Sequence, residues 1–267
     1  MLSRRAFGFL ALPVLPDKPR SAGITVAIDR GLHLRDAILL ADNRPGYVDA
    51  VKLGWGTSAI VPEGTLRDKI GAYRAKDIGV MPGGTLMEIA AVEGVYERFL
   101  DACGDYGFTH IEVSNGTFDL AGEKPSLIRE AKRRGFAVFA EVGRKDSCYT
   151  GYESAEVWLV EAMSDLDAGA DKIVLEGRES GTCGIYNGDG IVKADIIDLL
   201  AREIGPERFI FEAPQKRQQV EMIRRFGNEV NLGNIQPDDV VPLATLRLCL
   251  RSDTAKMFRE PALRGMQ

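Results

Sequence analysis

The chain has 267 residues, of which 45% are hydrophobic and 27% charged, an ordinary globular composition with enough length for one large core. Its formal net charge is −5 and no basic tract stands out, which argues against nucleic acid as the main partner. No apolar run is long enough to span a membrane, so we also expect no membrane partner.

The N-terminal segment allows two interpretations. Two arginines within the first five residues, followed by an apolar run, fit a twin-arginine export signal. Pro13 and Pro16 break that run early, however, and no small-residue cleavage site follows. We therefore expect a lead-in over residues 1–22 and a single barrel domain over residues 23–267.

From residue 24 onward, short apolar runs alternate with helical patterns. Strands are expected at 24–29, 48–54, 78–81, 110–113, 137–142, 172–175, 208–213 and 230–234. Helices are expected at 34–41, 63–76, 86–106, 125–134, 153–168, 193–204, 215–226 and 238–250. About eight strand–helix units predict an α/β fold, a single (β/α)8 TIM barrel with its site at the carboxyl ends of the strands. A doubly wound open sheet is less favoured, because it concentrates its site at one switch point, whereas here every strand end carries glycines or charges.

Charged residues end several of these strands, and alternation sends every second residue into the barrel. Counting back from the strand ends gives an inward set of Asp29, Lys52, Glu112, Glu141, Glu176, Glu212 and Asn231. Four glutamates at one depth repel each other strongly unless a cation lies among them. Because the chain has only two histidines, that cation should be a hard ion held by oxygen, and Mg²⁺ fits best.

We therefore predict a magnesium site. Its candidate ligands are Glu112, Glu141, Glu176 and Glu212, not all of which can bind directly, because Mg²⁺ usually keeps several waters. The alternative is a lattice of ion pairs, in which basic side chains alone neutralise the four acids. The basic residues available for it are Lys52, Lys145 and Arg178.

The same three basic residues are the catalytic candidates. Lys145 lies just past its strand, where a partly desolvated lysine among carboxylates can move a proton, or it is a solvated loop lysine. Arg178 has a planar fork suited to a carboxylate or phosphate, or it pairs with Glu179 or Glu212. Both alternatives remain open from the sequence.

Barrels often bind phosphate with their last two loops and a helix N-terminus. The predicted substrate-binding residues are Lys216, Asn231, Asn234, Arg247 and Arg251. Arg247 and Arg251 could equally flank the final helix. Trp55, between two glycines, could line the site or pack between subunits. The four cysteines are scattered without metal-ligand spacing, which favours a reduced, cytoplasmic compartment.

Six motifs in matching order resemble the phosphosulfolactate synthase family over residues 23–254. They are residues 51–58 (VKLGWGTS), 83–86 (GGTL), 141–145 (EVGRK), 176–181 (EGRESG), 211–216 (FEAPQK) and 230–234 (VNLGN). The resemblance implies a lyase on a single barrel that adds sulfite to phosphoenolpyruvate, giving phosphosulfolactate, an early step towards coenzyme M. It also implies Mg²⁺ dependence and a homo-oligomer, expected to be a trimer.

By the same resemblance, Lys145 delivers or removes the proton at carbon, while Arg178 and cations near the last loops hold the anionic groups. The segment 12–20 resembles the bacterial and plant branch of the family, which includes plant heat-stress-associated proteins. Two alternatives therefore stay open. One is another Mg²⁺-dependent enolate enzyme acting on a phosphorylated acid, and the other is a non-catalytic stress-associated protein.

Overall fold

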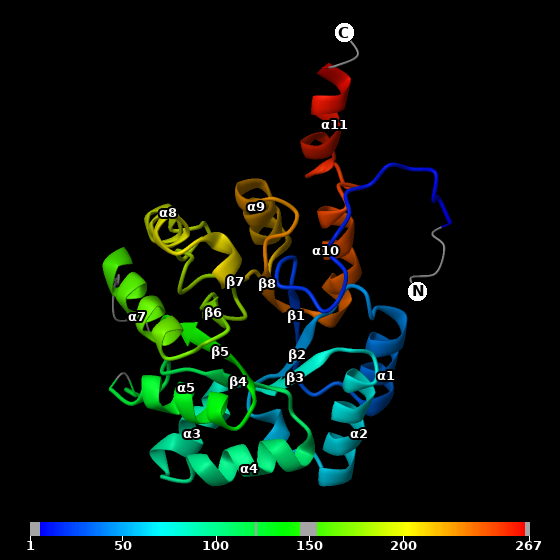
Figure 1. The fold of residues 1–267 in the computed structure, drawn as a ribbon. Coiled ribbons are helices and arrows are strands. Elements are labelled where there is room, and N and C mark those ends of the chain that lie inside the picture. The colour runs from blue at the N-terminus through cyan, green and yellow to red at the C-terminus, as the bar shows by residue number, and fades with distance from the viewer. Residues whose placement is uncertain (1–5, 121, 145–153, 265–267) are drawn as a thin grey trace.

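A computed structural model describes residues 6–120, 122–144 and 154–264 of the chain. Eight strands form a nearly closed barrel with helices around it, in the order β3-β2-β1-β8-β7-β6-β5-β4 (Figure 1). Every pairing in this sheet is parallel. The predicted (β/α)8 barrel is therefore confirmed.

The strands fall where the apolar runs predicted them. They are β1 (Thr25–Asp29), β2 (Ala50–Leu53), β3 (Gly79–Pro82), β4 (His110–Val113), β5 (Ala137–Val142), β6 (Lys172–Leu175), β7 (Phe209–Glu212) and β8 (Leu232–Ile235). The α-helices of the described residues are α1 (Leu34–Asn43), α2 (Glu63–Arg74), α3 (Gly84–Val92), α4 (Tyr96–Tyr106), α5 (Lys124–Arg133), α7 (Ala155–Asp167), α8 (Ala194–Glu203), α9 (Lys216–Phe226), α10 (Val240–Arg247) and α11 (Ala255–Arg264). Short 3-10 turns are η1 (Thr57–Ala59), η2 (Pro206–Arg208) and η3 (Pro237–Asp239).

Two helices differ from the expectation. The single helix predicted over 86–106 is divided into α3 and α4, because Gly94 adopts a left-handed φ of 71° that an α-helix cannot contain. The structure also adds α11, which the sequence did not predict and which extends away from the barrel beside the C-terminus (Figure 1). Within the described residues, no helix combines the length and apolar content needed to cross a membrane.

The barrel interior is built in layers. One cluster of buried residues fills its middle: Ile24, Val26, Ala50, Met81, Phe139, Val174 and Ile210. Because side chains alternate along a strand, residues two positions further on point into the same interior one layer higher. Those positions hold Lys52 after Ala50, Glu141 after Phe139 and Glu212 after Ile210. This buried cluster, called the apolar plug from here on, therefore lies directly beneath a layer of charged side chains.

The ring is weakest between β3 and β4, which share no ladder in the sheet order. Near its lower end, the Thr109 N–H donates to the Val80 carbonyl at 3.0 Å. Near its upper end, the Gly84 N–H at the start of α3 donates to Glu112 Oε1 at 2.9 Å. A Cβ on Gly84 would overlap the Ser114 hydroxyl, so only glycine allows this approach. A side chain thus completes the ring where backbone pairing stops.

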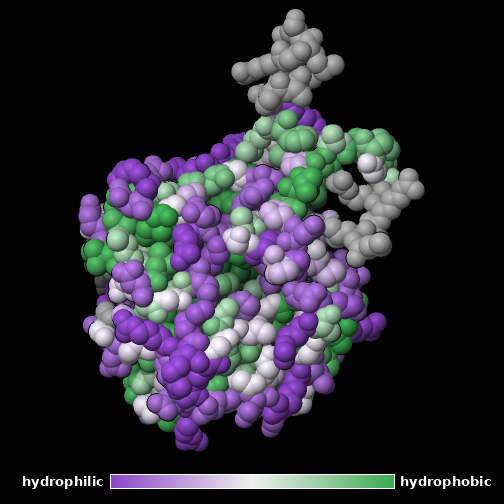
Figure 2. Space-filling model, viewed as in Figure 1, coloured by the Kyte–Doolittle hydropathy of each residue, from purple (hydrophilic) through white to green (hydrophobic). Residues whose placement is uncertain are grey.

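The described part of the lead-in is attached at the amino end of the barrel. Lys18 Nζ donates to the carbonyls of Pro45 and Val48, and Arg20 pairs with Asp49 at 2.7 Å. Further towards the N-terminus, Phe7 and Phe9 are 66% and 82% exposed. The space-filling view shows hydrophobic surface on the arm near the base of α11 (Figure 2).

Candidate active site

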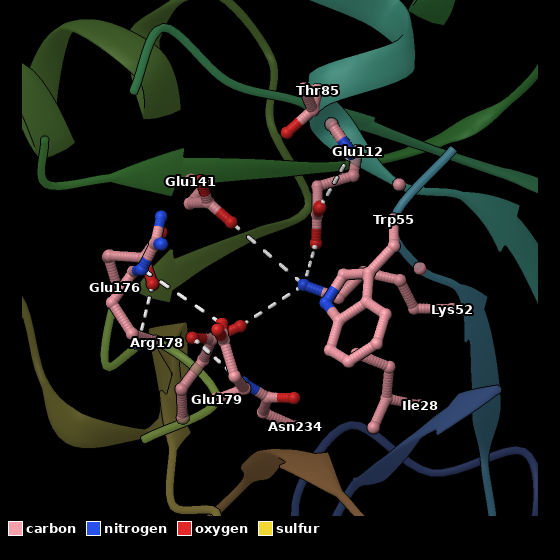
Figure 3. A pocket seen from close by; sticks show the side chains of 14 residues that line it. Ile28, Lys52, Trp55, Thr85, Glu112, Glu141, Glu176, Arg178, Glu179 and Asn234 are labelled. Carbon is pink, nitrogen blue, oxygen red and sulfur yellow. Dashed lines mark hydrogen bonds and ion pairs between the residues drawn. The ribbon is translucent and has the colours of Figure 1, made fainter. Parts of the chain in front are cut away.

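The upper layer opens into a cavity of about 240 Å³ at the carboxyl ends of the strands. Its lining residues are Ile28, Lys52, Gly54, Trp55, Gly83, Gly84, Thr85, Glu112, Glu141, Glu176, Arg178, Glu179, Glu212 and Asn234 (Figure 3). The cavity is smaller than the roughly 300–1,000 Å³ typical of drug-sized ligands, so it suits a small metabolite. Six charged residues from the sequence motifs line this one cavity.

Lys52 lies at the centre of this charge cluster. Its Nζ is 3.0 Å from Glu112 Oε2, 3.1 Å from Glu212 Oε1 and 3.9 Å from Glu141 Oε2. The three acids come from β4, β7 and β5, so one ammonium joins strands from opposite sides of the barrel (Figure 3). Lys52 and all three glutamates are buried. The ion pairs that sequence analysis kept as an alternative are therefore present around Lys52.

Burial and charge act in opposite directions on these groups. Burial by itself lowers the pKa of Lys52, but Glu112, Glu212 and Glu141 together raise that pKa well above 10.5, so the ammonium stays protonated. Burial raises the pKa of Glu112, and the neighbouring Glu141 and Glu212 raise it further, while Lys52 opposes them. Glu112 is therefore a buried carboxyl that is protonated more easily than an ordinary glutamate.

The loop after β6 closes tightly against the end of β7. The Gly177 N–H donates to Glu212 Oε2 at 3.0 Å, and the Arg178 N–H donates to Glu176 Oε1 at 2.6 Å. A Cβ on Gly177 would lie 2.9 Å from the Tyr186 ring and 3.0 Å from the Glu212 carbonyl, which leaves no room for a side chain. This glycine lets the Glu176–Gly181 motif place two carboxylates and Arg178 at one cavity wall.

Asn234 reaches the cavity because β8 contains a bulge. Thr25 and Ala27 of β1 pair with Leu232 and Ile235, so two steps along β1 match three along β8. The Asn234 Nδ2 donates to Glu212 Oε2 at 3.4 Å, which fixes the orientation of the amide. Its Oδ1 is buried and has no hydrogen-bond partner among the described residues. The amide therefore offers the cavity an acceptor, which suits a donor or a cation rather than a phosphate oxygen.

Three cavity residues have strained backbones. Trp55, Arg178 and Asn234 have φ values of 59°, 58° and 57°, in the left-handed region that favours glycine. Each such residue costs on the order of 1–3 kcal/mol and persists only where the surroundings enforce it, typically at functional sites. Trp55 lines the cavity, which supports the first of the two roles considered for it.

Two predicted substrate-binding residues lie at the opposite end of the barrel, which corrects the prediction. Asn231 accepts from the Ile24 N–H and donates to the carbonyls of Glu207 and Phe209. Arg247 donates to the carbonyls of Asn228, Val230 and Ile24. Both side chains tie the starts of β1 and β8 together below the apolar plug, so neither reaches the cavity.

Three further residues are placed differently from the expectation. Lys216 and Arg251 both approach Asp253, at 2.9 Å and 3.8 Å, and neither lines the cavity. Asp29 points outward between β1 and α2, where it pairs with Lys69 and accepts from the Tyr73 hydroxyl. Lys145, the predicted proton-transfer residue, lies outside the described residues.

The predicted magnesium site does not fit the geometry of the described residues. Among them, no group of three or more acidic, histidine or cysteine side chains is arranged to hold a metal ion. The Lys52 ammonium instead lies among three of the four glutamates proposed as ligands. The involvement of Mg²⁺ therefore stays a prediction from the family resemblance.

Sequence reasoning missed Glu88, which is fully buried on α3. Its carboxylate accepts from the Ser114 hydroxyl and from the N–H groups of Thr117 and Phe118 at 2.8 Å each. It thereby holds the loop that follows Glu112. The signal was available, because Glu88 is a lone acid between apolar residues of one helix, and such a buried charge needs partners.

The cysteines differ in state. Cys103 and Cys249 are buried free thiols, whereas Cys183, in the loop after β6, is disulfide-bonded. This departs from the expectation of reduced thiols throughout.

A parallel barrel with a charged cavity at the carboxyl ends of its strands is the architecture of barrel enzymes. Residues 13–253 match the family model described as (2R)-phospho-3-sulfolactate synthase (ComA). The phosphosulfolactate synthase of Methanocaldococcus jannaschii is 41% identical over 87% of this chain and 93% of its own length. The phosphosulfolactate synthase of Bacillus subtilis is 41% identical over 92% of this chain and 97% of its own length. The chain therefore belongs to the phosphosulfolactate synthase family and is an enzyme of the lyase type.

A plant protein and a solved barrel structure are more distantly similar to this chain. The Arabidopsis thaliana protein HEAT-STRESS-ASSOCIATED 32 is 23% identical over 87% of this chain and 88% of its own length. The chain is thus more similar to the bacterial and archaeal synthases than it is to this plant protein. A 3-hexulose-6-phosphate synthase from Salmonella typhimurium superposes with a TM-score of 0.57 at 15% identity, covering 85% of this chain and 99% of its own, which shows a shared fold.

Proposed function

We propose that this chain catalyses the addition of sulfite to phosphoenolpyruvate, giving phosphosulfolactate. The observation that carries the proposal is the convergence of all six family motifs on one cavity. Lys52, Glu141, Arg178 and Glu212 come from four separate motifs and line the same small space. The resemblance makes this reaction an early step towards coenzyme M, and the scattered cysteines favour the cytoplasm as its compartment.

The reaction needs a place for developing negative charge. Sulfite sulfur attacks the methylene carbon, a C–S bond forms, and the double-bond electrons move onto the carboxylate as an enediolate. A proton that comes from bisulfite or from solvent then adds to the carbon that carries the phosphate, which completes a one-to-one addition with no leaving group. Fixed positive charge near the enediolate oxygens lowers the barrier, because it interacts more strongly with the transition state than with the substrate.

The described residues can supply that charge. Lys52 remains an ammonium because its glutamate neighbours raise its pKa, and Glu112 and Glu212 hold it in position. Arg178 lines the cavity with a partly exposed guanidinium suited to a carboxylate, sulfonate or phosphate. Asn234 adds an acceptor for a protonated group. We assign proton transfer to carbon to Lys145, as the resemblance predicts.

The cavity nevertheless has an excess of acid. Five glutamates line it against one lysine and one arginine among the described residues. A polyanionic substrate must therefore be accompanied by further positive charge. Lys145 is one predicted source, and Mg²⁺, predicted from the resemblance, is another. Chelation by EDTA followed by return of Mg²⁺ tests the metal separately from the reaction.

The test is direct. Purified protein is incubated with phosphoenolpyruvate, sulfite and Mg²⁺, and phosphosulfolactate is measured by mass spectrometry, with each component omitted in turn. Product that requires all the components supports the proposal. Binding of phosphoenolpyruvate without product contradicts it and favours another enolate enzyme. Absence of binding favours the non-catalytic alternative.

We also propose a homo-oligomer, with a trimer as the resemblance predicts. The exposed Phe7 and Phe9 on the N-terminal arm support it, because apolar side chains on an extended arm are stabilised by burial against another subunit. Light scattering after size exclusion gives the mass in solution. A mass of three 29.2 kDa subunits supports the trimer, and a single-subunit mass contradicts oligomerisation.

A further inference from the structure

The turn after β2 holds an indole at the mouth of the cavity. Trp55 is 60% exposed and also lines the cavity, on the same side as Ile28 and Lys52 (Figure 3). Its own left-handed backbone and that of Gly56, with φ values of 59° and 67°, fix the turn. A large aromatic residue kept in this conformation with most of its surface in water is not explained by core packing.

Arg30, from the loop after β1, stacks on this indole. Its guanidinium carbon lies 4.8 Å from the ring centroid, within cation–π range. Arg30 is exposed, and no carboxylate of the described residues forms a salt bridge with it. A guanidinium held over a ring in this way still has N–H groups with which it can donate to an anion. The loop after β1 thus brings a positive charge to a mouth whose interior is rich in carboxylates.

We propose that Trp55 and Arg30 form a clamp that binds the phosphate group of phosphoenolpyruvate at the cavity mouth. The inference rests on the proposed function, since it assigns part of that substrate's binding. The buried end of the ligand meets Lys52 and Arg178, and the outer end meets the Arg30 fork beside the indole. Arg30 is accordingly a specificity residue that touches the ligand and not the reacting carbon.

The molecule contains a matched control for this pair. Arg67 stacks on Tyr106 with its guanidinium carbon 4.6 Å from the ring centroid, on the outer surface between α2 and α4. Arg67→Ala removes the same charge and the same type of stacking at a place remote from the cavity. Any effect seen with Arg30→Ala but not with Arg67→Ala therefore belongs to the mouth of the cavity.

Steady-state kinetics give the first test. We expect Arg30→Ala to raise the KM for phosphoenolpyruvate by about tenfold or more, with kcat changed by less than about threefold, because a charge-assisted contact made in both ground and transition states is lost. Arg30→Lys should recover part of the affinity, because it keeps the charge without the fork. An unchanged KM in Arg30→Ala, or an equal change in Arg67→Ala, overturns the clamp.

Tryptophan fluorescence gives a second test that requires no turnover. The chain has two tryptophans, and Trp158 is only 2% exposed, so acrylamide quenching reports mainly on Trp55. We expect phosphoenolpyruvate to protect Trp55 from acrylamide in the wild type and in Arg67→Ala, but much less in Arg30→Ala. Protection without product leaves the clamp standing while the proposed reaction fails. Product formation without protection overturns the clamp while the reaction stands.

Discussion

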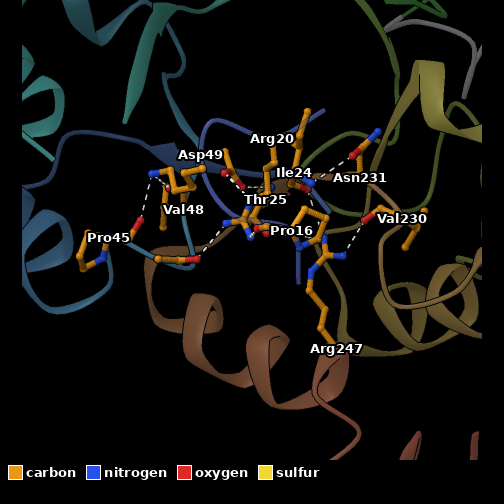
Figure 4. A network of polar contacts seen from close by, with 12 residues as sticks. Pro16, Arg20, Ile24, Thr25, Pro45, Val48, Asp49, Val230, Asn231 and Arg247 are labelled. Carbon is orange, nitrogen blue, oxygen red and sulfur yellow. Dashed lines mark hydrogen bonds and ion pairs between the residues drawn. The ribbon is translucent and has the colours of Figure 1, made fainter. Parts of the chain in front are cut away.

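The two ends of the barrel both contain buried charge, but they differ in what that charge faces. At the amino end, Arg247 donates to three backbone carbonyls and Arg20 pairs with Asp49 (Figure 4). At the carboxyl end, Lys52 is shared by three glutamates, and Asn234 Oδ1 has no partner among the described residues. Buried charge alone therefore does not identify a site. The functional end is distinguished by charged and polar groups that line a cavity, whereas Arg247 at the other end binds backbone carbonyls.

The largest effect should come from removing the cation at the carboxyl end. Lys52→Met keeps an unbranched side chain of nearly the same length but leaves Glu112, Glu141 and Glu212 buried without their ammonium. We expect a loss of about 3–5 kcal/mol in the free energy of unfolding, measured by urea denaturation, together with loss of turnover. Lowering the pH should restore part of the stability as the carboxylates become protonated. Wild-type stability at neutral pH would show that Lys52 does not hold the cluster.

The matching change at the amino end should separate stability from function. Arg247→Met leaves the carbonyls of Asn228, Val230 and Ile24 without their donor, and we expect a loss of about 3 kcal/mol. Because this network lies below the apolar plug, kcat and KM of the folded fraction should match the wild type. A change in KM without a loss of stability would place Arg247 back in substrate binding.

A pH effect should also arise away from the cavity. Burial lowers the pKa of His110 from 6.5 to about 4. The unfolded chain therefore binds more protons between these values, so stability is full above pH 6.5 and falls as the pH drops through this range. We expect a loss of about 2 kcal/mol between pH 7 and pH 5. His110→Gln should flatten that slope in thermal melts, and an unchanged slope would contradict the assignment.

The smallest change compares two asparagines on one strand. Asn234→Ala should reduce kcat/KM about tenfold to a hundredfold, because it removes a polar group from the cavity. Its stability should change by no more than about 1 kcal/mol. Asn231→Ala should instead lower stability by about 1–2 kcal/mol, through its lost backbone contacts, without altering the kinetics. Parallel assays and melts of the two variants decide whether the two ends are as distinct as we propose.

Much of this arrangement could be read from the sequence. Apolar runs located the eight strands, and the charges at their ends indicated that Lys52 and four glutamates meet at one rim. Asp29 was misplaced because every residue of β1 is buried, so the strand has no exposed face from which the direction of its side chains can be read. Asn234 could be assigned only by analogy, since the bulge that turns it inward depends on pairing with β1. Whether a metal or a lysine lies among the glutamates depends on distances that a sequence does not contain.

The contact between Glu112 and the start of α3 carries a constraint of its own. The same carboxylate completes the ring at the β3–β4 opening through Oε1 and holds Lys52 through Oε2. If Glu112 is replaced to fit a different metabolite, the hydrogen bond that joins β4 to the start of α3 at the β3–β4 opening is lost as well. Evolution or design on this barrel should therefore change Trp55 and Arg30 at the cavity mouth before it changes Glu112.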